Sequence, residues 1–442
     1  MGSRQSDEQT YKIVTDIGLT LSWKPSGSGF AKSTMILFTV TVIGGACNYL
    51  YQVFMLKTLT VEDYAELAAV LSLFYIITMP AQTVATMLTR YSSKFIAEGR
   101  QAQIYWLLRR SIWISLAISL VMVVVLYASM PWLVSYLALT SGLPLMIILA
   151  GLIITMMTQV GFGIGQGLQR FNLISLHTLV WPIGKLLIGI VLVIAGFGVA
   201  GAIGGVMVGM TFGMVILLLG VRDQLSQPGL PITKEESHSI MVYLIPVLVA
   251  VMCYGVLTNI DIFLANHYLD KSQAGLYSTV STLSKIILFL PGAIGTVMFP
   301  KITHAHTRKE DTVRIMRRSI FWNVALTGLA AVVFLLLPDT ILRLLSSVSV
   351  DNYAMAEQAI QVLGISMMFF GLTSLFMNYG LATNRHQYII VILSFTLVEV
   401  ALLMLFHSSP VAIAYDMLIV SLSMCLISYA YMEFKFRTET TY

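Results

Sequence analysis

Residues 258–301 read TNIDIFLANHYLDKSQAGLYSTVSTLSKIILFLPGAIGTVMFPK, two apolar runs separated by a short polar break at 270–273. Both runs are long enough to cross a bilayer at about 1.5 Å per helical residue. Asp261 lies near the end of the first run, and Lys285 lies in the middle of the second. A charge at such depth costs about 2.5–3.5 kcal/mol on insertion scales, so both residues are candidates for function.

The same stretch has an earlier copy in the chain. Shifted back by 211 positions, Asn259 falls on Asn48 without a gap, and residues 317–320 fall on 109–112 once three residues are deleted. The sequence therefore predicts two related halves. Where membrane proteins are built from parallel repeats of this kind, the binding site lies at the interface between the repeats.

Composition predicts an all-α polytopic membrane protein. The chain has 442 residues, of which 57% are hydrophobic and only 11% charged, and its mean hydropathy is +0.84. A soluble domain carries about 25% charged residues, so soluble fold classes are excluded. The net charge of +5 does not indicate a nucleic-acid partner, because the basic residues lie in short loops. Cys47, Cys253 and Cys425 fall inside apolar runs and predict no disulfide framework.

The apolar runs predict twelve spans in two six-helix lobes around a central cavity. The spans are 33–56, 64–89, 112–130, 143–165, 173–195, 200–221, 239–264, 276–299, 319–337, 357–380, 388–407 and 410–432. The predicted domains are a cytoplasmic N-terminal tail (1–32), an N-terminal lobe (33–221), a cytoplasmic linker (222–238), a C-terminal lobe (239–432) and a cytoplasmic C-terminal tail (433–442).

The basic residues support this topology independently. With the N-terminus inside, 21 of the 26 Lys and Arg residues fall in inside segments and 3 in outside loops, while Lys185 and Lys285 lie within spans. Positive charge accumulates on the cytoplasmic side of membrane proteins. The sequence therefore predicts a multi-pass protein of the cytoplasmic (inner) membrane, surrounded by lipid, with both termini in the cytoplasm.

Four spans carry polar residues on one helical face, at steps of three and four residues. They are Thr41, Gly45, Asn48 and Gln52; Thr78, Gln82, Thr86 and Thr89; Tyr254, Thr258 and Asp261; and Ser278, Ser281, Thr282 and Lys285. In one interpretation, Ser and Thr bond to their own helix while Asn and Gln join helices. The repeat-matched positions and the two charges favour a second interpretation, a hydrated cavity between the halves.

Other charged groups also lie in or near the spans. Lys185 is close to the middle of the fifth span and Glu399 is deep in the eleventh, so a structural ion pair between them competes with a role in substrate binding. The acids at the mouth of the second span are expected to be solvated. They are Glu62, Asp63 and Glu66.

The sixth span carries a glycine at every fourth position, which predicts close packing against another helix. These residues are Gly201, Gly205, Gly209 and Gly213. The sequence shows neither a nucleophile–base pair nor a His/Cys cluster with metal-ligand spacing. It therefore predicts no enzymatic activity, no catalytic residues, no cofactor and no metal site.

Several motifs resemble the polysaccharide-export branch of the multidrug/oligosaccharidyl-lipid/polysaccharide flippase superfamily. They are Asn259-Ile-Asp261, Ala274-Gly-Leu-Tyr277, Phe299-Pro-Lys301, Gly167-Leu-Gln-Arg-Phe171, Gly198-Val-Ala-Gly-Ala202 and Leu59-Thr-Val-Glu-Asp-Tyr64. The resemblance runs from about residue 33 to 432. It implies a flippase for lipid-linked oligosaccharides, with spans one, two, seven and eight lining the cavity. The first span lacks the acid common in multidrug extruders and the arginine of lipid II flippases, which favours the polysaccharide branch.

Such a cargo has a sugar head, an anionic phosphate or pyrophosphate and a polyprenyl tail. Lys285 is the first candidate for binding the phosphate and Lys185 the second, because a lysine ammonium binds phosphate as a point charge. Arg90 and Lys301, repeat mates at the cytoplasmic span ends, either collect the anionic head or anchor the protein at the membrane surface. The full set of substrate-site candidates is Lys285, Asp261, Asn48, Asn259, Lys185, Thr282, Gln52, Gln82, Arg90 and Lys301.

Two other functions stay open from the sequence. A cation-coupled exporter of drugs or other small molecules would use Asp261 as its H⁺ or Na⁺ site, although no acid accompanies it in the first span. A membrane polymerase or ligase of glycans is the third candidate, and the short outside loops speak against it.

The topology predicts the outcome of reporter fusions. Fusions after Arg222 and after Arg318 should report the cytoplasm, and a fusion near Ser347 should report the outside. Paired enzymatic reporters that are active on opposite sides of the membrane measure this directly. A cytoplasmic signal at Ser347 would contradict the assignment of the spans.

Overall fold

The computed structural model describes residues 27–307, 312–346, 353–382 and 388–439, but not the side chains of 27–35, 38, 292–301, 303–307, 381–382 and 434–439. All regular structure in these ranges is helical. In chain order the elements are α2 (Gly27–Thr58), α3 (Val61–Ala97), α4 (Gln101–Tyr136), α5 (Leu143–Gly167), α6 (Phe171–Leu192), the π-helical turn η1 (Val193–Phe197), α7 (Gly198–Gly220), α8 (Arg222–Leu225), α9 (Lys234–Leu257), α10 (Ile260–Tyr268), α11 (Lys271–Thr307), α12 (Thr312–Leu336), α13 (Pro338–Leu345), α14 (Tyr353–Ala382), α15 (Tyr388–Leu405) and α16 (Pro410–Glu439).

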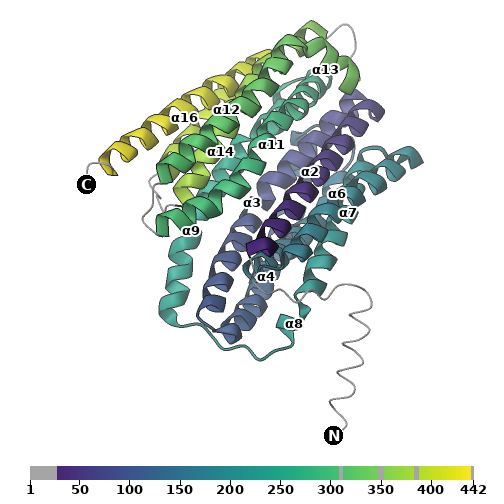
Figure 1. Ribbon diagram of the computed structural model, residues 1–442. Helices are drawn as coiled ribbons and strands as arrows, with labels where there is room; N and C mark the ends of the chain where they lie inside the picture. The colour runs from purple at the N-terminus through teal and green to yellow at the C-terminus, as the bar shows by residue number, and fades with distance from the viewer. Residues whose placement is uncertain (1–26, 308–311, 347–352, 383–387, 440–442) are drawn as a thin grey trace.

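The long helices lie side by side as an elongated bundle (Figure 1). Within the described ranges, eleven helical stretches are long and apolar enough to cross a membrane. One of them, Phe171–Gly220, spans 50 residues and folds back on itself between α6 and α7. The reversal uses Gly196 (φ +91°) and Gly198 (φ +50°), whose left-handed backbone favours glycine. With this hairpin counted as two crossings, the twelve predicted spans are confirmed.

The two halves of the chain repeat one packing pattern. In the first half, α3 packs on α5, α5 on α7, α2 on α6, and α6 on α7. The equivalent pairs of the second half are α11 with α14, α14 with α16, α9 with α15, and α15 with α16. The halves meet where α3 contacts α9, α10 and α11, so three of the spans with polar stripes lie at this seam. The internal repeat read from the sequence is therefore a repeat of structure.

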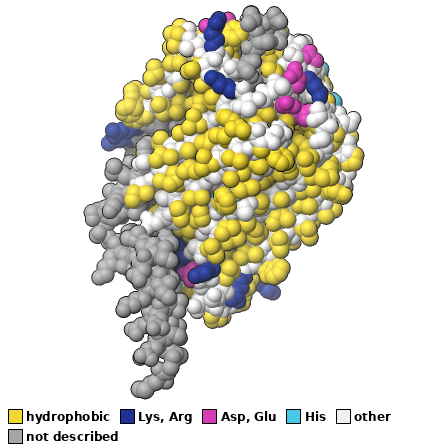
Figure 2. Space-filling view, turned by 90° about the vertical axis from the view of Figure 1, so that its right-hand side faces the viewer, with side chains coloured by type: hydrophobic (Ala, Val, Ile, Leu, Met, Phe, Trp, Pro, Cys, Tyr) yellow, Lys and Arg dark blue, Asp and Glu magenta, His cyan; other side chains and the backbone are white. Residues whose placement is uncertain are grey.

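The surface matches a bilayer environment. In Figure 2 a broad apolar band covers the middle of one face, and the coloured charges gather toward the two ends. Large apolar side chains stay exposed on this kind of surface, for example Trp113 (69%) and Phe289 (74%). In water such exposure would be costly, whereas lipid chains cover it without penalty.

The glycines of α7 allow it to lie directly against α6, as predicted. A Cβ atom on Gly205 would lie 2.3 Å from the Cα atom of Gly189, and one on Gly209 would lie 2.4 Å from the backbone nitrogen of Lys185. The backbones of α6 and α7 therefore touch along the row of glycines on α7. This close approach fixes the height of Lys185 in the N-terminal half.

At the end of the bundle that the basic residues predict to be external, the halves are joined by polar contacts. Glu66 of α3 accepts hydrogen bonds from the Thr140 N–H and hydroxyl groups, both at 2.9 Å, and its Oε1 lies 3.4 Å from Nζ of Lys271 on α11. Nearby, the ring of His267 stacks on Tyr136 with centroids 3.6 Å apart. We call these five residues the outer joint.

Glu66 corrects one expectation. Its side chain is not solvated, because only 4% of the residue is exposed. The connection between α4 and α5 folds over the mouth of α3 and brings Thr140 to the carboxylate. The sequence placed Glu66 correctly at the mouth of the second span, but it did not show that the loop between α4 and α5 covers this residue.

The α6–α7 contact predicts an asymmetry between two glycine substitutions. Gly205→Ala should destabilise the protein by about 1–3 kcal/mol, because the added methyl group meets backbone atoms that cannot move independently. Gly45→Ala is the matched control, since nothing lies within 4 Å of a Cβ atom at that position. Thermal unfolding of the purified variants in detergent compares them. Equal melting temperatures would contradict the close packing.

Candidate functional site

The seventh span is broken beside Asp261. Helix α9 ends at Leu257 and α10 begins at Ile260. Between them, the Thr258 hydroxyl donates to the Tyr254 carbonyl (2.9 Å) and Asn259 Nδ2 donates to the Gly255 carbonyl (2.9 Å). The Asn259 side chain thereby satisfies a carbonyl that the end of the helix leaves free, whereas the Tyr254 carbonyl also accepts the backbone N–H of Thr258. The break places Asp261 in the first turn of α10, where the helix dipole favours a negative charge.

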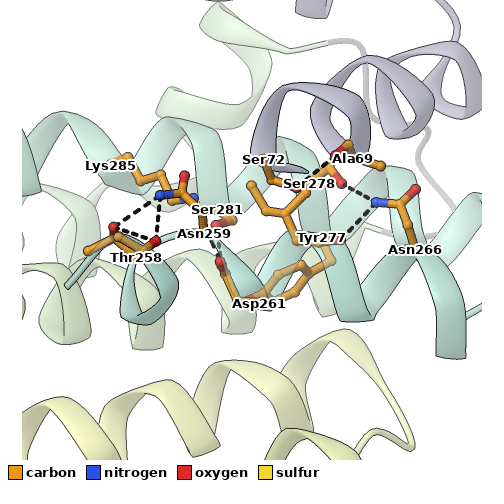
Figure 3. Close-up of polar contacts among 12 residues, drawn as sticks. Ala69, Ser72, Thr258, Asn259, Asp261, Asn266, Tyr277, Ser278, Ser281 and Lys285 are labelled. Atoms are coloured by element: carbon orange, nitrogen blue, oxygen red, sulfur yellow. Dashed lines mark hydrogen bonds and ion pairs between the residues drawn. The ribbon is translucent and has the colours of Figure 1, made fainter. Parts of the chain in front are cut away.

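Asp261 is completely buried and held by α11 (Figure 3). Its Oδ2 accepts hydrogen bonds from the hydroxyls of Tyr277 (3.0 Å) and Ser281 (2.8 Å). Its Oδ1 lies 3.7 Å from Nζ of Lys285. Positions 277, 281 and 285 follow at steps of four, so one face of α11 supplies all three partners. Asp261 and Lys285 therefore form an ion pair inside the bundle.

Glu399 of α15 adds a second acid to this pair. It is 1% exposed, and neither carboxylate oxygen has a hydrogen-bond partner among the described residues. It interacts electrostatically with both Asp261 and Lys285. We call Asp261, Lys285 and Glu399 the acidic cluster, because it holds two acids and one base. A buried charge without a partner is costly, so this cluster is suited to take up a proton or another cation.

Lys185 occupies a different environment in the N-terminal half. It is 2% exposed, and its Nζ donates to Oδ1 of Asn48 at 3.1 Å. The same atom lies 4.2 Å from the ring centroid of Tyr51 and 5.9 Å from that of Trp181. Hydrogen bonding to the Ala202 carbonyl (2.8 Å) holds the Tyr51 ring in place. Lys185 is thus stabilised by an amide oxygen and two aromatic faces.

The alternative ion pair between Lys185 and Glu399 is wrong for this structure. Within the described ranges, no carboxylate lies within ion-pair distance of Lys185. Helix α6 packs on α2, α5 and α7, whereas α15 packs on α9, α10, α14 and α16. The two residues therefore belong to separate halves and have separate partners.

Two further candidates meet at a tyrosine. The Tyr64 hydroxyl donates to Oε1 of Gln52 at 3.3 Å, and the side chain of Thr282 interacts with the same hydroxyl. Helices α2, α3 and α11 contribute these three side chains, so the contact crosses the seam between the halves. Tyr64 itself was not selected from the sequence as a site residue.

The remaining candidates lie apart from these groups. Gln82 is exposed and its Nε2 donates to Sδ of Met79 at 3.5 Å. Arg90 is exposed, with its guanidinium 4.2 Å from the ring centroid of Tyr243. The side chain of Lys301 lies outside the described residues.

The structure thus divides the ten candidates into groups. Asp261, Lys285 and Asn259 come together, and so do Lys185 and Asn48. Five of the six threonines of the stripes follow the local interpretation, since each of these five donates to the carbonyl four residues earlier on its own helix. They are Thr41, Thr78, Thr86, Thr89 and Thr258.

Sequence reasoning missed Tyr277 and Tyr51, which complete the two lysine environments. Tyr277 shares the four-residue spacing of Ser281 and Lys285, and that spacing was a usable signal. No comparable signal points to Tyr51, because its ring is recruited by a lysine 134 positions away.

Comparisons with known proteins agree with this architecture. The family model described as "Polysaccharide biosynthesis protein" matches residues 30–306. Among curated proteins, no sequence matches the chain.

Solved structures share the fold at low sequence identity. A multidrug resistance MATE family transporter of the MOP superfamily aligns in its inward-facing conformation with a TM-score of 0.73 at 13% identity, covering 90% of this chain and 98% of that one. An outward-facing conformation of such a transporter aligns at 0.70 and 13%, covering 93% and 97%. Lipid II flippase MurJ in an inward closed conformation aligns at 0.67 and 15%, covering 91% and 87%. These likenesses establish the fold.

The two lysine environments predict losses of stability of different size when each lysine is neutralised. Lys285→Met should destabilise the protein by about 3–5 kcal/mol, because Asp261 is left buried without its counter-charge. The double variant Asp261→Asn/Lys285→Met should recover most of that loss. Lys185→Met is the matched comparison and should cost less, because its described partners are neutral. Thermal unfolding measures all three, and equal losses for the two single variants would contradict the assignment.

Proposed function

The chain belongs to the polysaccharide biosynthesis protein family, and from this premise we propose that it is a flippase for lipid-linked oligosaccharides. It would move an oligosaccharide carried on polyprenyl phosphate or pyrophosphate across the cytoplasmic membrane, with both termini in the cytoplasm. The transport cycle would be alternating access, in which the two halves rock around a fixed site at their seam. The fold of MOP-superfamily transporters supports this mode.

The chemistry of the cargo defines what the protein must supply. Sugar hydroxyls and a phosphate cannot enter hydrocarbon without replacing the water that they lose. The protein must therefore offer cationic groups for the phosphate and hydrogen-bonding groups for the sugar. The polyprenyl tail needs only contact with lipid or with an apolar protein surface.

The observation that carries the proposal is the environment of Lys185. This buried lysine contacts an amide oxygen and aromatic rings, and no carboxylate among the described residues neutralises it. A cation kept in a low-dielectric interior without an acid attracts an anion strongly. A phosphate group that reaches it in another state of the cycle would supply the missing counter-charge.

Lys285 would bind phosphate by exchange. In this structure it is engaged with Asp261, and Asp261 is also hydrogen-bonded by Tyr277 and Ser281. Uptake of a cation by Asp261 and Glu399 would release Lys285 for the phosphate. The acidic cluster would thereby link cargo binding to H⁺ or Na⁺, and Arg90 at the cytoplasmic end of α3 would collect the anionic head on entry.

A second candidate function is a cation-coupled exporter of small molecules. The acidic cluster favours it, because two acids with one lysine suit a coupling cation whatever the cargo is. Drug susceptibility of cells with and without the protein distinguishes this function from the first. A glycan polymerase or ligase receives no support from the family or from the fold.

The flippase proposal predicts a specific pattern of variant activities. Lys285→Ala should abolish flipping of a polyprenyl-phosphate-linked oligosaccharide in reconstituted vesicles. Lys285→Arg should retain part of it, because the positive charge persists while its geometry changes. Asp261→Asn should impair transport without loss of expression. Accessibility of the sugar to an external glycosidase or lectin measures the rate.

The double variant Asp261→Asn/Lys285→Ala separates a phosphate role from a structural one. If Lys285 only neutralises Asp261, removing both charges should restore flipping to the rate of Asp261→Asn alone. If Lys285 binds the phosphate, the double variant stays inactive although it folds. Normal flipping by Lys285→Ala would rule out this lysine and leave Lys185 as the phosphate site.

A further inference from the structure

The segment between the halves is fastened to the N-terminal half by two arginines. Arg170 binds both carboxylate oxygens of Asp223, with an Nη1–Oδ1 distance of 2.9 Å. Arg109 donates to the carbonyls of Leu225 (3.1 Å from Nε) and Gln227 (2.9 Å from Nη2). Guanidinium groups that engage two acceptors hold both distance and orientation. The start of this segment therefore does not behave as a free tether.

Backbone contacts continue the attachment. The Leu230 N–H donates to the carbonyl of Ala102 at 3.0 Å. Gly229 lies directly on α4, where a Cβ atom would be 2.7 Å from the backbone nitrogen of Trp106. In Figure 1 the chain after α8 follows the lower end of the bundle to reach α9. The segment is thus bound to α4 from Leu225 to Leu230.

The first turns of α9 are also held by the N-terminal half. Three contacts reach them from α3 and from the turn that follows α3. They are the two-pronged hydrogen bonding of Arg100 to Glu236 (Nη2–Oε2 3.0 Å), the Tyr91–Ser239 hydroxyl pair (3.1 Å) and the Arg90 guanidinium over the Tyr243 ring (4.2 Å). Ile240 is buried in the same apolar cluster as Phe95 and Leu107.

The last turns of α9 belong to the other half. The Thr396 hydroxyl of α15 donates to the Cys253 carbonyl at 3.4 Å. The Tyr254 hydroxyl donates to the Phe370 carbonyl of α14 at 3.4 Å. Gly255 also lies against the side chain of Met79 on α3, where a Cβ atom would be 2.3 Å from Cγ, but this contact is apolar. One helix is therefore bonded to both halves, each at a different end.

Pro246 lies between these two attachments. Proline has no N–H, so the carbonyl of Val242 loses its bond within the helix, and the ring weakens the helix at this point. Kinks in long helices concentrate at such positions. A bend at Pro246 would let the two ends of α9 follow different bodies while both sets of contacts stay intact.

We propose that the two moving bodies divide inside α9 at Pro246 rather than in the connecting segment. Residues 222–245 then travel with α2–α7, and the boundary lies beyond the 222–238 linker expected from the sequence. The outer joint is the contact that must open between the bodies. This inference goes beyond the proposed function, because it concerns which segments move and not which cargo is carried.

Two ion pairs provide a matched test with a short bifunctional thiol reagent. Arg100→Cys/Glu236→Cys replaces a pair that lies within one proposed body, and Glu66→Cys/Lys271→Cys replaces a pair between the bodies. Both are made in a chain whose three native cysteines are replaced by alanine. Cross-linking 100 to 236 should leave the transport rate within roughly twofold of the unlinked variant, whereas cross-linking 66 to 271 should abolish transport.

Either opposite result overturns the proposal. Loss of transport on linking 100 to 236 would mean that the start of α9 moves with the C-terminal half. Normal transport with 66 linked to 271 would mean that the outer joint does not open. The unlinked variants serve as baselines for the transport rate. If neither these variants nor the wild type flips the oligosaccharide, the proposed cargo is wrong, and the division of the two bodies is tested by the spin labels.

Spin labels give a reading that needs no cargo. A label pair at Ser93 and Met241 lies within one body, and a pair at Met241 and Leu405 spans Pro246; all three residues are exposed. Making and cleaving the 66–271 cross-link should change the distribution of distances between the labels at Met241 and Leu405. The distribution for the labels at Ser93 and Met241 should stay unchanged. The same response from both pairs would overturn the proposal.

The proline itself has a matched control. Pro246→Ala should slow transport roughly tenfold while the melting temperature stays equal or rises, because a stiffer α9 raises the barrier to bending. Pro131→Ala removes an exposed proline from α4, which lies within one body, and should leave the rate unchanged. Equal rates for the two variants would argue against a hinge at Pro246.

Discussion

The interior of a bilayer supplies no hydrogen bonds, so every buried charge and every interrupted helix must find its partners within the protein. The break between α9 and α10 meets this demand with the side chain of Asn259, which bonds the freed Gly255 carbonyl, and with the Thr258 hydroxyl, which bonds the Tyr254 carbonyl. Asp261, which follows that break and is buried, is in turn bonded by one face of α11. A discontinuous helix and a buried acid are thus two parts of one arrangement, and each is tolerable because the other is present.

The two halves keep the same order of helix packing but have different polar interiors. In the C-terminal half, two acids share one lysine, whereas in the N-terminal half a lysine rests on an amide and aromatic rings. Asn259 and Asn48 show how the repeat diverged. They are repeat mates, yet one closes a helix break and the other accepts a hydrogen bond from Lys185.

The same constraint shapes the connection between the halves. At the end of the bundle that the basic residues predict to be cytoplasmic, water is available, and the chain uses arginines and an exposed segment to bind α9 to the N-terminal half. Deeper in the bundle, α9 relies on two hydroxyl–carbonyl bonds to the C-terminal half. At the opposite end, the outer joint closes the seam through the Glu66 carboxylate. Thr140 orients this carboxylate by two hydrogen bonds, and Lys271 of the other half pairs with it. Rigid contacts within a body and few polar contacts between bodies are what a rocking motion requires.

The sequence by itself determined the number of spans, the internal repeat, the close packing along the glycines of α7 and the depth of the buried charges. These follow from hydropathy and from a period of 3.6 residues, which are local properties of the chain. The tertiary structure alone decided which charges meet. Glu399 lies near Lys285 instead of pairing with Lys185, and Glu66 is covered by Thr140 instead of water. Periodicity states which face of a helix is polar, but the partner of each polar group depends on which helices lie side by side, and packing between distant segments sets that.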